Sequence, residues 1–369
     1  MIVNNHPGTK KGVPEMRKQP LCSVCLVCFI IAFGLFMGPG GVAAKTVNLT
    51  YNCFFPPTVI QSKLAESWCK AVEKETKGEV KIAYYPGCAL ISSTQTFEGV
   101  EKGIADIGFS VLQYTRGRFP LMDFINLPLG YPSGPVATAI LNEVYDKFKP
   151  KELASAKLLY LHGHGPGVIH TKNKAIRTME DLKGLKIRSH GPTAETVKAL
   201  GGTPIALPMP ELYQALQKGV MDGGVWDFSA SYDWKLAEVI SKSTACYSIG
   251  YSLGFFVVMN KSKWNSLSPQ AQEVITRLSN EWTIKHGQAW NAADAQAMTF
   301  SLAQGNDLIG LNPKESKKWR KAIQPVIDAW LADTKSKNLP GEEVLKFVNK
   351  RLDDAKKGKF KSKYLAAEY

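Results

Sequence analysis

The chain has 369 residues and a formal net charge of +14, from 46 Lys and Arg residues against 32 Asp and Glu residues. This length is sufficient for two domains of ordinary size. The positive residues are dispersed along most of the chain, which argues against a dedicated nucleic-acid-binding protein. Lysine is dense only near the end, where we expect residues 346–369 to form a solvated basic helix and tail.

The first 44 residues predict a secretory signal peptide. A basic segment is followed by an uncharged apolar run, Leu21 to Met37, and then by the small residues Val42, Ala43 and Ala44. We expect cleavage near Ala44 and a periplasmic location. An uncleaved membrane anchor is the alternative, because the apolar run is close to the shortest segment that spans a bilayer.

Four cysteines follow the predicted cleavage site. Their spacing matches neither a zinc motif nor a redox Cys-x-x-Cys motif. A disulfide between Cys69 and Cys88 suits an oxidising compartment, and buried free thiols suit the same pattern equally well. The sequence leaves both interpretations open for the set Cys53, Cys69, Cys88 and Cys246.

The first half of the mature chain alternates between strand and helix patterns. Apolar and β-branched runs predict strands, and apolar residues at helical spacing predict helices. The predicted strands are 46–51, 80–85, 105–110, 157–161 and 168–171, and the predicted helices are 58–77 and 94–102. The glycine-rich strip Gly163–Gly167 separates two of these strands and indicates a crossing between domains.

The second half repeats the alternation. We predict a short helix capped by Thr178, strands at 186–188 and 220–226, and helices at 193–200 and 210–219. The apolar run 253–259 suits a buried strand that returns to the first domain. A helical pattern then extends from Ser268 to about Gln304, long enough to lie across both domains. Together these elements predict an α/β fold with doubly wound, mainly parallel sheets.

Arg188 is the strongest candidate for a functional residue. It ends the predicted strand 186–188, and ligands of open α/β sheets bind outside the carboxyl ends of the strands. A guanidinium there holds a carboxylate through two parallel hydrogen bonds, which a lysine cannot do. This position predicts a receptor for a small anion.

Five segments in order resemble the periplasmic substrate-binding proteins of TRAP transporters, the DctP-type receptors. The resemblance covers nearly the whole mature chain and rests on Gly99–Gly108, Gly117–Leu121, Asp181–Arg188, Glu211–Gly223 and Asn260–Pro269. It implies a two-lobed periplasmic-binding-protein fold with crossing strands and a long helix spanning both lobes. We expect lobe I to comprise 45–166 with 254–292, and lobe II to comprise 167–253 with 293–345. The resemblance also implies closure on a small organic acid and a membrane permease partner.

By this resemblance Arg188 pairs with the acid group of the ligand. Trp226 departs from the family pattern, because many members have an Asn at this place that hydrogen-bonds the ligand, and some have Glu-Trp with the Glu on a metal. Here Val225 precedes Trp226, so a metal is not expected, and the tryptophan offers a flat apolar wall with one N–H donor. Other candidates come from strand ends and neighbouring loops: Asn52, Phe54, Phe55, Ser110, Gln113, Tyr114, His164, His190 and Phe228.

The sequence contains no nucleophile elbow, phosphate loop or dinucleotide-binding glycine motif, so we expect no enzyme and no cofactor. We expect a transport receptor for a small organic monoanion, most simply a carboxylate that is hydroxylated, oxo-substituted or aromatic. A small sulfonate, a dicarboxylate and a sensor protein not coupled to transport are the alternatives. No nucleic-acid partner is expected.

Overall fold

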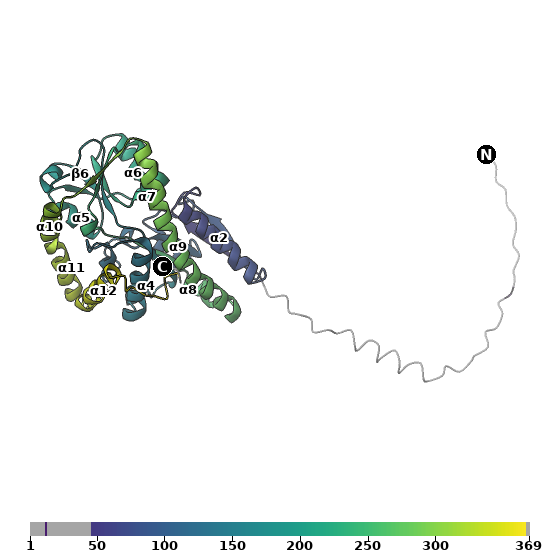
Figure 1. The fold of residues 1–369 in the computed structure, drawn as a ribbon. Helices are drawn as coiled ribbons and strands as arrows, with labels where there is room; N and C mark the ends of the chain where they lie inside the picture. The colour runs from purple at the N-terminus through teal and green to yellow at the C-terminus, as the bar shows by residue number, and fades with distance from the viewer. Residues whose placement is uncertain (1–11, 13–45, 367–369) are drawn as a thin grey trace, which may run out of the picture. The chain divides into compact units, whose positions relative to one another are not determined.

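The computed structural model describes Gly12 and residues 46–366, and strands alternate with helices through most of this range (Figure 1). The predicted signal peptide lies outside the described residues, apart from Gly12. None of the helices between residues 46 and 366 combines the length and the hydrophobicity needed to cross a bilayer.

The first sheet has five strands in the order β2-β1-β3-β10-β4. Strand β1 pairs in parallel with β2 and β3, whereas β10 is antiparallel to both of its neighbours, β3 and β4. The return of the run 253–259 to the first domain is therefore confirmed. The strands are β1 (Val47–Cys53), β2 (Val80–Tyr85), β3 (Ile107–Val111), β4 (Lys157–Gly163) and β10 (Gly254–Met259).

The second sheet has six strands in the order β11-β9-β5-β8-β6-β7. Strand β5 is antiparallel to β8 and β9, and the other pairs are parallel. Each sheet is thus mainly parallel with one antiparallel strand in its interior, which confirms the predicted fold class. The strands are β5 (Val168–Thr171), β6 (Lys186–Arg188), β7 (Thr203–Ile205), β8 (Gly223–Trp226), β9 (Lys242–Ala245) and β11 (Asp307–Gly310).

Two short segments carry the chain between the sheets. The glycine-rich strip predicted as a crossing joins β4 of the first sheet to β5 of the second, and residues 246–253 return from β9 to β10. The two crossings touch, because Gly167 and Tyr251 form an antiparallel bridge in which the Gly167 N–H donates to the Tyr251 carbonyl at 2.8 Å. We propose the lobe boundaries expected above, which fall at residues 166/167 and 253/254 within these crossings.

Helix α9 (Pro269–Ala303) is 35 residues long and confirms the predicted long helix. Its first turn is capped by the Ser268 hydroxyl, which accepts a hydrogen bond from the Ala271 N–H at 3.1 Å. The helix packs against α2, α4 and β4 on one side of the molecule and against α7 of the second lobe (Figure 1). It therefore connects both lobes.

The other helices cover the sheets. The α-helices are α2 (Ile60–Glu75), α3 (Thr96–Glu101), α4 (Gly134–Phe148), α5 (Pro192–Ala199), α6 (Met209–Gln217), α7 (Phe228–Asp233), α8 (Lys261–Asn265), α10 (Pro313–Ala322), α11 (Gln324–Ser336) and α12 (Gly341–Lys356). The 3₁₀ helices are η1 (Leu112–Tyr114), η2 (Met122–Asn126), η3 (Lys151–Leu153), η4 (Met179–Leu182), η5 (Leu236–Glu238) and η6 (Tyr247–Ile249).

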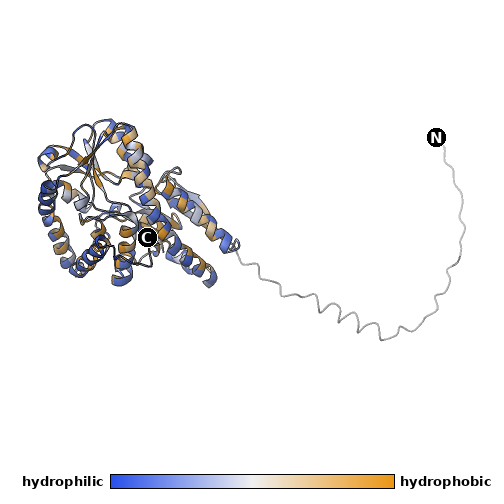
Figure 2. Cartoon of the chain, in the orientation of Figure 1, coloured by the Kyte–Doolittle hydropathy of each residue, from blue (hydrophilic) through white to orange (hydrophobic). Residues whose placement is uncertain are grey.

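The C-terminal segment differs from the expected solvated helix and tail. Helix α12 begins at Gly341 and packs against α4, burying Val344, Val348 and Leu352. These residues recur at helical spacing, so one face of α12 is apolar although the helix is rich in charge. Figure 2 shows hydrophilic blue residues along the C-terminal helices together with hydrophobic orange ones.

The four cysteines after the predicted cleavage site form no disulfide in the structure. Cys69 is buried and Cys88 is half-buried, and neither is bridged. Burial raises the pKa of both thiols, which keeps them protonated and unreactive at neutral pH. The structure therefore agrees with the interpretation as free thiols.

Candidate ligand-binding site

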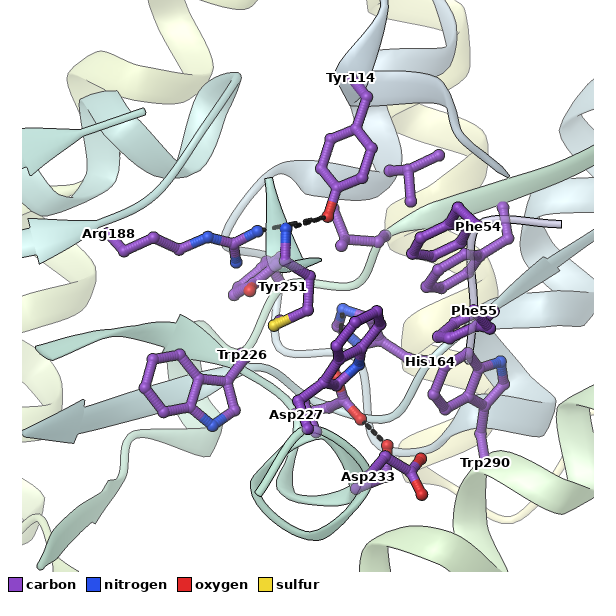
Figure 3. A pocket seen from close by; sticks show the side chains of 17 residues that line it. Phe54, Phe55, Tyr114, His164, Arg188, Trp226, Asp227, Asp233, Tyr251 and Trp290 are labelled. Carbon is purple, nitrogen blue, oxygen red and sulfur yellow. Dashed lines mark hydrogen bonds and ion pairs between the residues drawn. The ribbon is translucent and has the colours of Figure 1, made fainter. Parts of the chain in front are cut away.

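A cavity lies where the crossings meet the ends of the central strands of both sheets. Its walls are mostly aromatic, and they come from segments far apart in the sequence (Figure 3). The aromatic lining residues are Phe54, Phe55, Tyr114, Trp226, Trp234, Tyr251, Phe255 and Trp290. The other lining residues are Val111, His164, Arg188, Met209, Asp227, Ser229, Ala230, Asp233 and Leu253.

Local sequence features place Arg188 at this cavity. Thr178 and Asp181 form a reciprocal capping box at the start of η4, and Gly184 adopts a positive φ of 78° between η4 and β6. Strand β6 then pairs in parallel with β8, and its last residue is Arg188. The side chain is fully buried, at 0% exposure.

The guanidinium of Arg188 is held by neutral groups. Its Nε donates to the Leu207 carbonyl at 2.8 Å, its Nη1 to the Val225 carbonyl at 3.2 Å, and its Nη2 to the Tyr114 hydroxyl at 3.4 Å. Within residues 46–366 no carboxylate forms an ion pair with it. An isolated buried charge is costly unless an opposite charge joins it, so the site is electrostatically prepared for an anion.

Tyr114 links the two lobes across the cavity. It lies in η1 of the first lobe, and its hydroxyl accepts from the Met209 N–H at 3.1 Å as well as from Arg188, both in the second lobe. Burial raises the pKa of Tyr114, although Arg188 opposes this shift, so the hydroxyl keeps its proton at neutral pH. That proton is available to an acceptor in the cavity.

Trp226 is among the residues that line the cavity. Its ring stacks on the His170 imidazole with the centroids 4.5 Å apart and the planes at 6°. Its indole N–H donates to the Ser231 hydroxyl at 3.0 Å. One face of the Trp226 ring is therefore covered by His170, and the N–H that we expected to serve a ligand has an internal partner.

Flat aromatic surfaces face the second-lobe residues. Figure 3 shows Arg188 and Trp226 on the left of the view and Phe54, Phe55 and Trp290 on the right. Phe255 connects this group, because its ring stacks on Trp290 with centroids 5.0 Å apart and lies nearly parallel to Phe54. Such walls favour a flat, apolar ligand body.

Acidic groups gather at the end of the cavity remote from Tyr114 (Figure 3). Asp227 follows β8, Asp233 ends α7, and Asp294 approaches from α9, where it accepts from the Ser229 N–H at 2.8 Å. Burial first, and the neighbouring Asp227 second, raise the pKa of Asp233 to about 7 and that of Asp294 well above its usual range. Among the described residues no three His, Cys, Asp or Glu side chains are grouped to hold a metal ion.

Three predicted residues of the first lobe do not line this cavity. Asn52 uses its amide to fasten the loop at Leu90 and Ile91, since its Oδ1 accepts from both N–H groups at 3.1 Å. Ser110 donates to the Ser93 carbonyl at 2.6 Å, and Gln113 accepts from the Gly254 N–H at 3.3 Å. All three therefore have structural hydrogen bonds, and we no longer assign them to the ligand.

Two predicted residues of the second lobe also lie outside the cavity. His190 lines a neighbouring groove, and its ring meets Tyr114 edge-on with centroids 5.3 Å apart. Phe228 packs edge-on against His170 behind Trp226, with centroids 5.3 Å apart. Of the predicted set, the cavity brings together Arg188, Trp226, Phe54, Phe55, Tyr114 and His164.

Several lining residues escaped sequence reasoning. Asp227 directly follows the predicted strand 220–226, so its position at a strand end was a usable signal. Tyr251, Phe255 and Trp290 gave no such signal, because they read as core residues of a crossing, a buried strand and a long helix. Phe255 and Trp290 reach the cavity because β10 pairs with β3 and β4 and because α9 packs against β4 and α7.

The comparisons with known proteins agree with this architecture. The model of the family "bacterial extracellular solute-binding protein, family 7", DctP, matches residues 52–333. The periplasmic C4-dicarboxylate-binding protein DctP of Rhodobacter capsulatus is 24% identical, over 77% of this chain and 86% of its own length.

Two solved structures are similar over most of their length. One is a TRAP solute-binding protein from an unidentified marine microbe, specific for aromatic acid ligands and bound to meta-hydroxyphenylacetate. It is 29% identical, covers 82% of this chain and 98% of that one, and has a TM-score of 0.79. The other, from Rhodoferax ferrireducens T118, contains copurified benzoate. It is 26% identical, covers 85% and 99% of the two chains, and has a TM-score of 0.79.

The family model extends across the crossings and contains all of the cavity-lining residues. Together with the two-lobed fold and the buried arginine, these matches establish the class of protein. The chain belongs to family 7 of the bacterial extracellular solute-binding proteins, the DctP-type solute receptors of TRAP transporters.

Proposed function

We propose that this protein is the periplasmic receptor of a TRAP transporter, binds a small aromatic monocarboxylate between its lobes, and delivers it to a membrane permease. The observation that carries the proposal is the fully buried Arg188, which lacks an acidic partner among residues 46–366. A ligand carboxylate would supply the missing negative charge through two charge-assisted hydrogen bonds.

The rest of the lining supports an aromatic ligand with a single negative charge. In the described part of the chain, Arg188 is the only Lys or Arg that lines the cavity, whereas Asp227 and Asp233 both line it. A second carboxylate would therefore meet like charge at the far end. The walls formed by Phe54, Phe255 and Trp290 suit stacking on a ring.

A ligand panel tests the proposed function. We expect isothermal calorimetry to detect benzoate and its derivatives with dissociation constants in about the micromolar range, and thermal unfolding to shift upward as ligand accumulates. Benzenesulfonate tests the sulfonate alternative, because the guanidinium can also donate two hydrogen bonds to sulfonate oxygens. Succinate is expected not to bind. Tight binding of succinate without binding of any monoanion would contradict the proposal.

Affinity for benzoate is expected to fall severalfold as the pH rises from 6 to 8. Asp233, whose pKa is raised to about 7, ionises across this interval and adds negative charge beside the anion. Asp227 and Asp294 are the acids near it, and Lys63 on α2 is the cation that opposes its shift. Calorimetry at fixed ionic strength and at several pH values measures how steeply the affinity for benzoate changes with pH. Asp233→Asn should make this slope smaller. An unchanged slope in that variant would exclude Asp233 as the titrating group.

A further inference from the structure

His164 and Asp227 present two acceptor atoms to each other inside the cavity. His164 is 1% exposed, and its Nδ1 lies within hydrogen-bond distance of the Gly165 carbonyl oxygen. A carbonyl oxygen only accepts, so the proton must sit on Nδ1. In the neutral ring Nε2 is then an acceptor, and it has no hydrogen-bond partner.

The Nε2 of His164 lies 4.0 Å from Oδ1 of Asp227. The other Asp227 oxygen, Oδ2, accepts from the Ser229 hydroxyl. Burial lowers the pKa of His164, although Asp227 opposes this shift, so the ring carries no second proton at neutral pH with which to bond Asp227. Two acceptors therefore converge without a donor between them.

The nearby acid Asp294 does not fill this gap. Even where protonated Asp294 donates to Asp227, Nε2 of His164 keeps an unused lone pair. A buried acceptor without a partner is unfavourable, and a donor that reaches it gains correspondingly. Both residues line the cavity, away from the end where Tyr114 meets Arg188 (Figure 3).

We propose that His164 Nε2 and Asp227 Oδ1 form a subsite that selects a hydrogen-bond donor on the ligand, at the end remote from its carboxylate. This inference rests on the proposed function and makes the ligand class more specific. The preferred ligand is an aromatic monocarboxylate that carries a ring hydroxyl or amino group. A ring hydroxyl donates its single hydrogen to one of these acceptors, and a ring amino group has a hydrogen for each of them, while the carboxylate lies at Arg188.

The test compares ligands whose ring substituent can donate a hydrogen bond with ligands whose substituent can only accept one. Wild-type protein is titrated with benzoate, 3- and 4-hydroxybenzoate, and 3- and 4-methoxybenzoate. We expect the better hydroxybenzoate to bind about tenfold tighter than benzoate, since the bond is made to buried acceptors that have no donor between them. The methoxy compounds have an ether oxygen in place of the donor and should bind no better than benzoate.

Two matched variants locate the subsite. Asp227→Asn keeps the shape of the side chain, but its NH₂ group donates to His164, so the preference for hydroxybenzoate should fall to within about threefold. Asp233→Asn removes a neighbouring carboxylate of the same cavity but leaves Nε2 of His164 and Oδ1 of Asp227 as acceptors. It should therefore change the affinities for benzoate and hydroxybenzoate together and retain the ratio between them. Thermal unfolding without ligand checks that both variants fold.

The outcomes distinguish this subsite from the function on which it rests. Benzoate and methoxybenzoate binding as tightly as hydroxybenzoate would overturn the subsite and leave the monocarboxylate receptor intact. Loss of the preference in Asp233→Asn but not in Asp227→Asn would also overturn it. If no carboxylate in the panel binds the wild type, the proposed function and the subsite fail together.

Discussion

Replacing Arg188 by alanine is expected to weaken binding of benzoate, or of the tightest-binding acid in the panel, by at least about a hundredfold. The guanidinium is the sole Lys or Arg side chain among the lining residues in the described range, and it is fully buried. Arg188→Lys is expected to restore binding only partly, because an ammonium cannot form the two-pronged contact. Calorimetry measures both variants.

The fold should survive these substitutions. Arg188 has three neutral hydrogen-bond partners and no ion pair among residues 46–366, so its removal leaves no carboxylate without a counter-charge. We therefore expect the ligand-free variants to unfold at temperatures close to that of the wild type, and circular dichroism provides this control. Unchanged affinity in the alanine variant would refute the assignment of Arg188.

Gly223→Ala is expected to destabilise the protein by about 3 kcal/mol or more. Gly223 begins β8 and pairs with Thr171 of the antiparallel strand β5. An added Cβ would overlap the His170 carbonyl oxygen and lie 2.9 Å from the Thr171 Cα. Both atoms belong to the backbone of a central strand, so neither can move aside without breaking the pairing of β8 with β5.

Chemical denaturation of Gly223→Ala measures this loss of unfolding free energy. Gly310→Ala is the matched control, because Gly310 also lies in a strand of the second sheet and a Cβ there meets no atom within 4 Å. The control should change stability by less than about 0.5 kcal/mol. Equal stability of the two variants would show that the close approach at Gly223 has no energetic consequence.

This glycine also gives a physical reason for one segment of the family resemblance. The sequence presents Gly223 only as part of the run Glu211–Gly223. The structure shows that β8 and β5 approach too closely there for a side chain, and β8 leads directly to Trp226 and Asp227 at the cavity. A requirement of backbone packing therefore positions residues of the candidate site.

Sequence reasoning was most successful where the determinants are local. The strands 80–85, 168–171 and 186–188 have the predicted bounds, because apolar alternation and flanking glycines act over a few residues. The long helix α9 was recognisable from its apolar spacing and its Ser-Pro start. Helix α4 was not predicted, since its start at Ser133, Gly134 and Pro135 reads as a loop until the Ser133 cap on Val136 is seen.

The position of Arg188 at a strand end could likewise be inferred from the sequence, because the capped turn before β6 sets where that strand finishes. The remaining lining residues depended on tertiary structure. Asn52 and Gln113 looked like ligand contacts, but their partners, the loop at Leu90 and the N–H of Gly254, come from other parts of the chain. Whether a polar side chain faces a cavity depends on which backbone groups long-range packing leaves unpaired.

The approach of His164 to Asp227 also depends on tertiary structure, although each residue has a local sequence signal. Each residue was visible in the sequence, one in a glycine-rich crossing and the other after a strand. Their 4.0 Å approach exists only because the chain crosses between the sheets and β8 pairs with β5. The sequence by itself indicated most of the strands, the long helix and the arginine at a strand end, because those signals act over a few residues or turns. It did not indicate β7, β9 and β11. Tertiary structure decided which aromatic walls and which acceptors face that arginine, because those contacts join residues separated by tens to hundreds of positions.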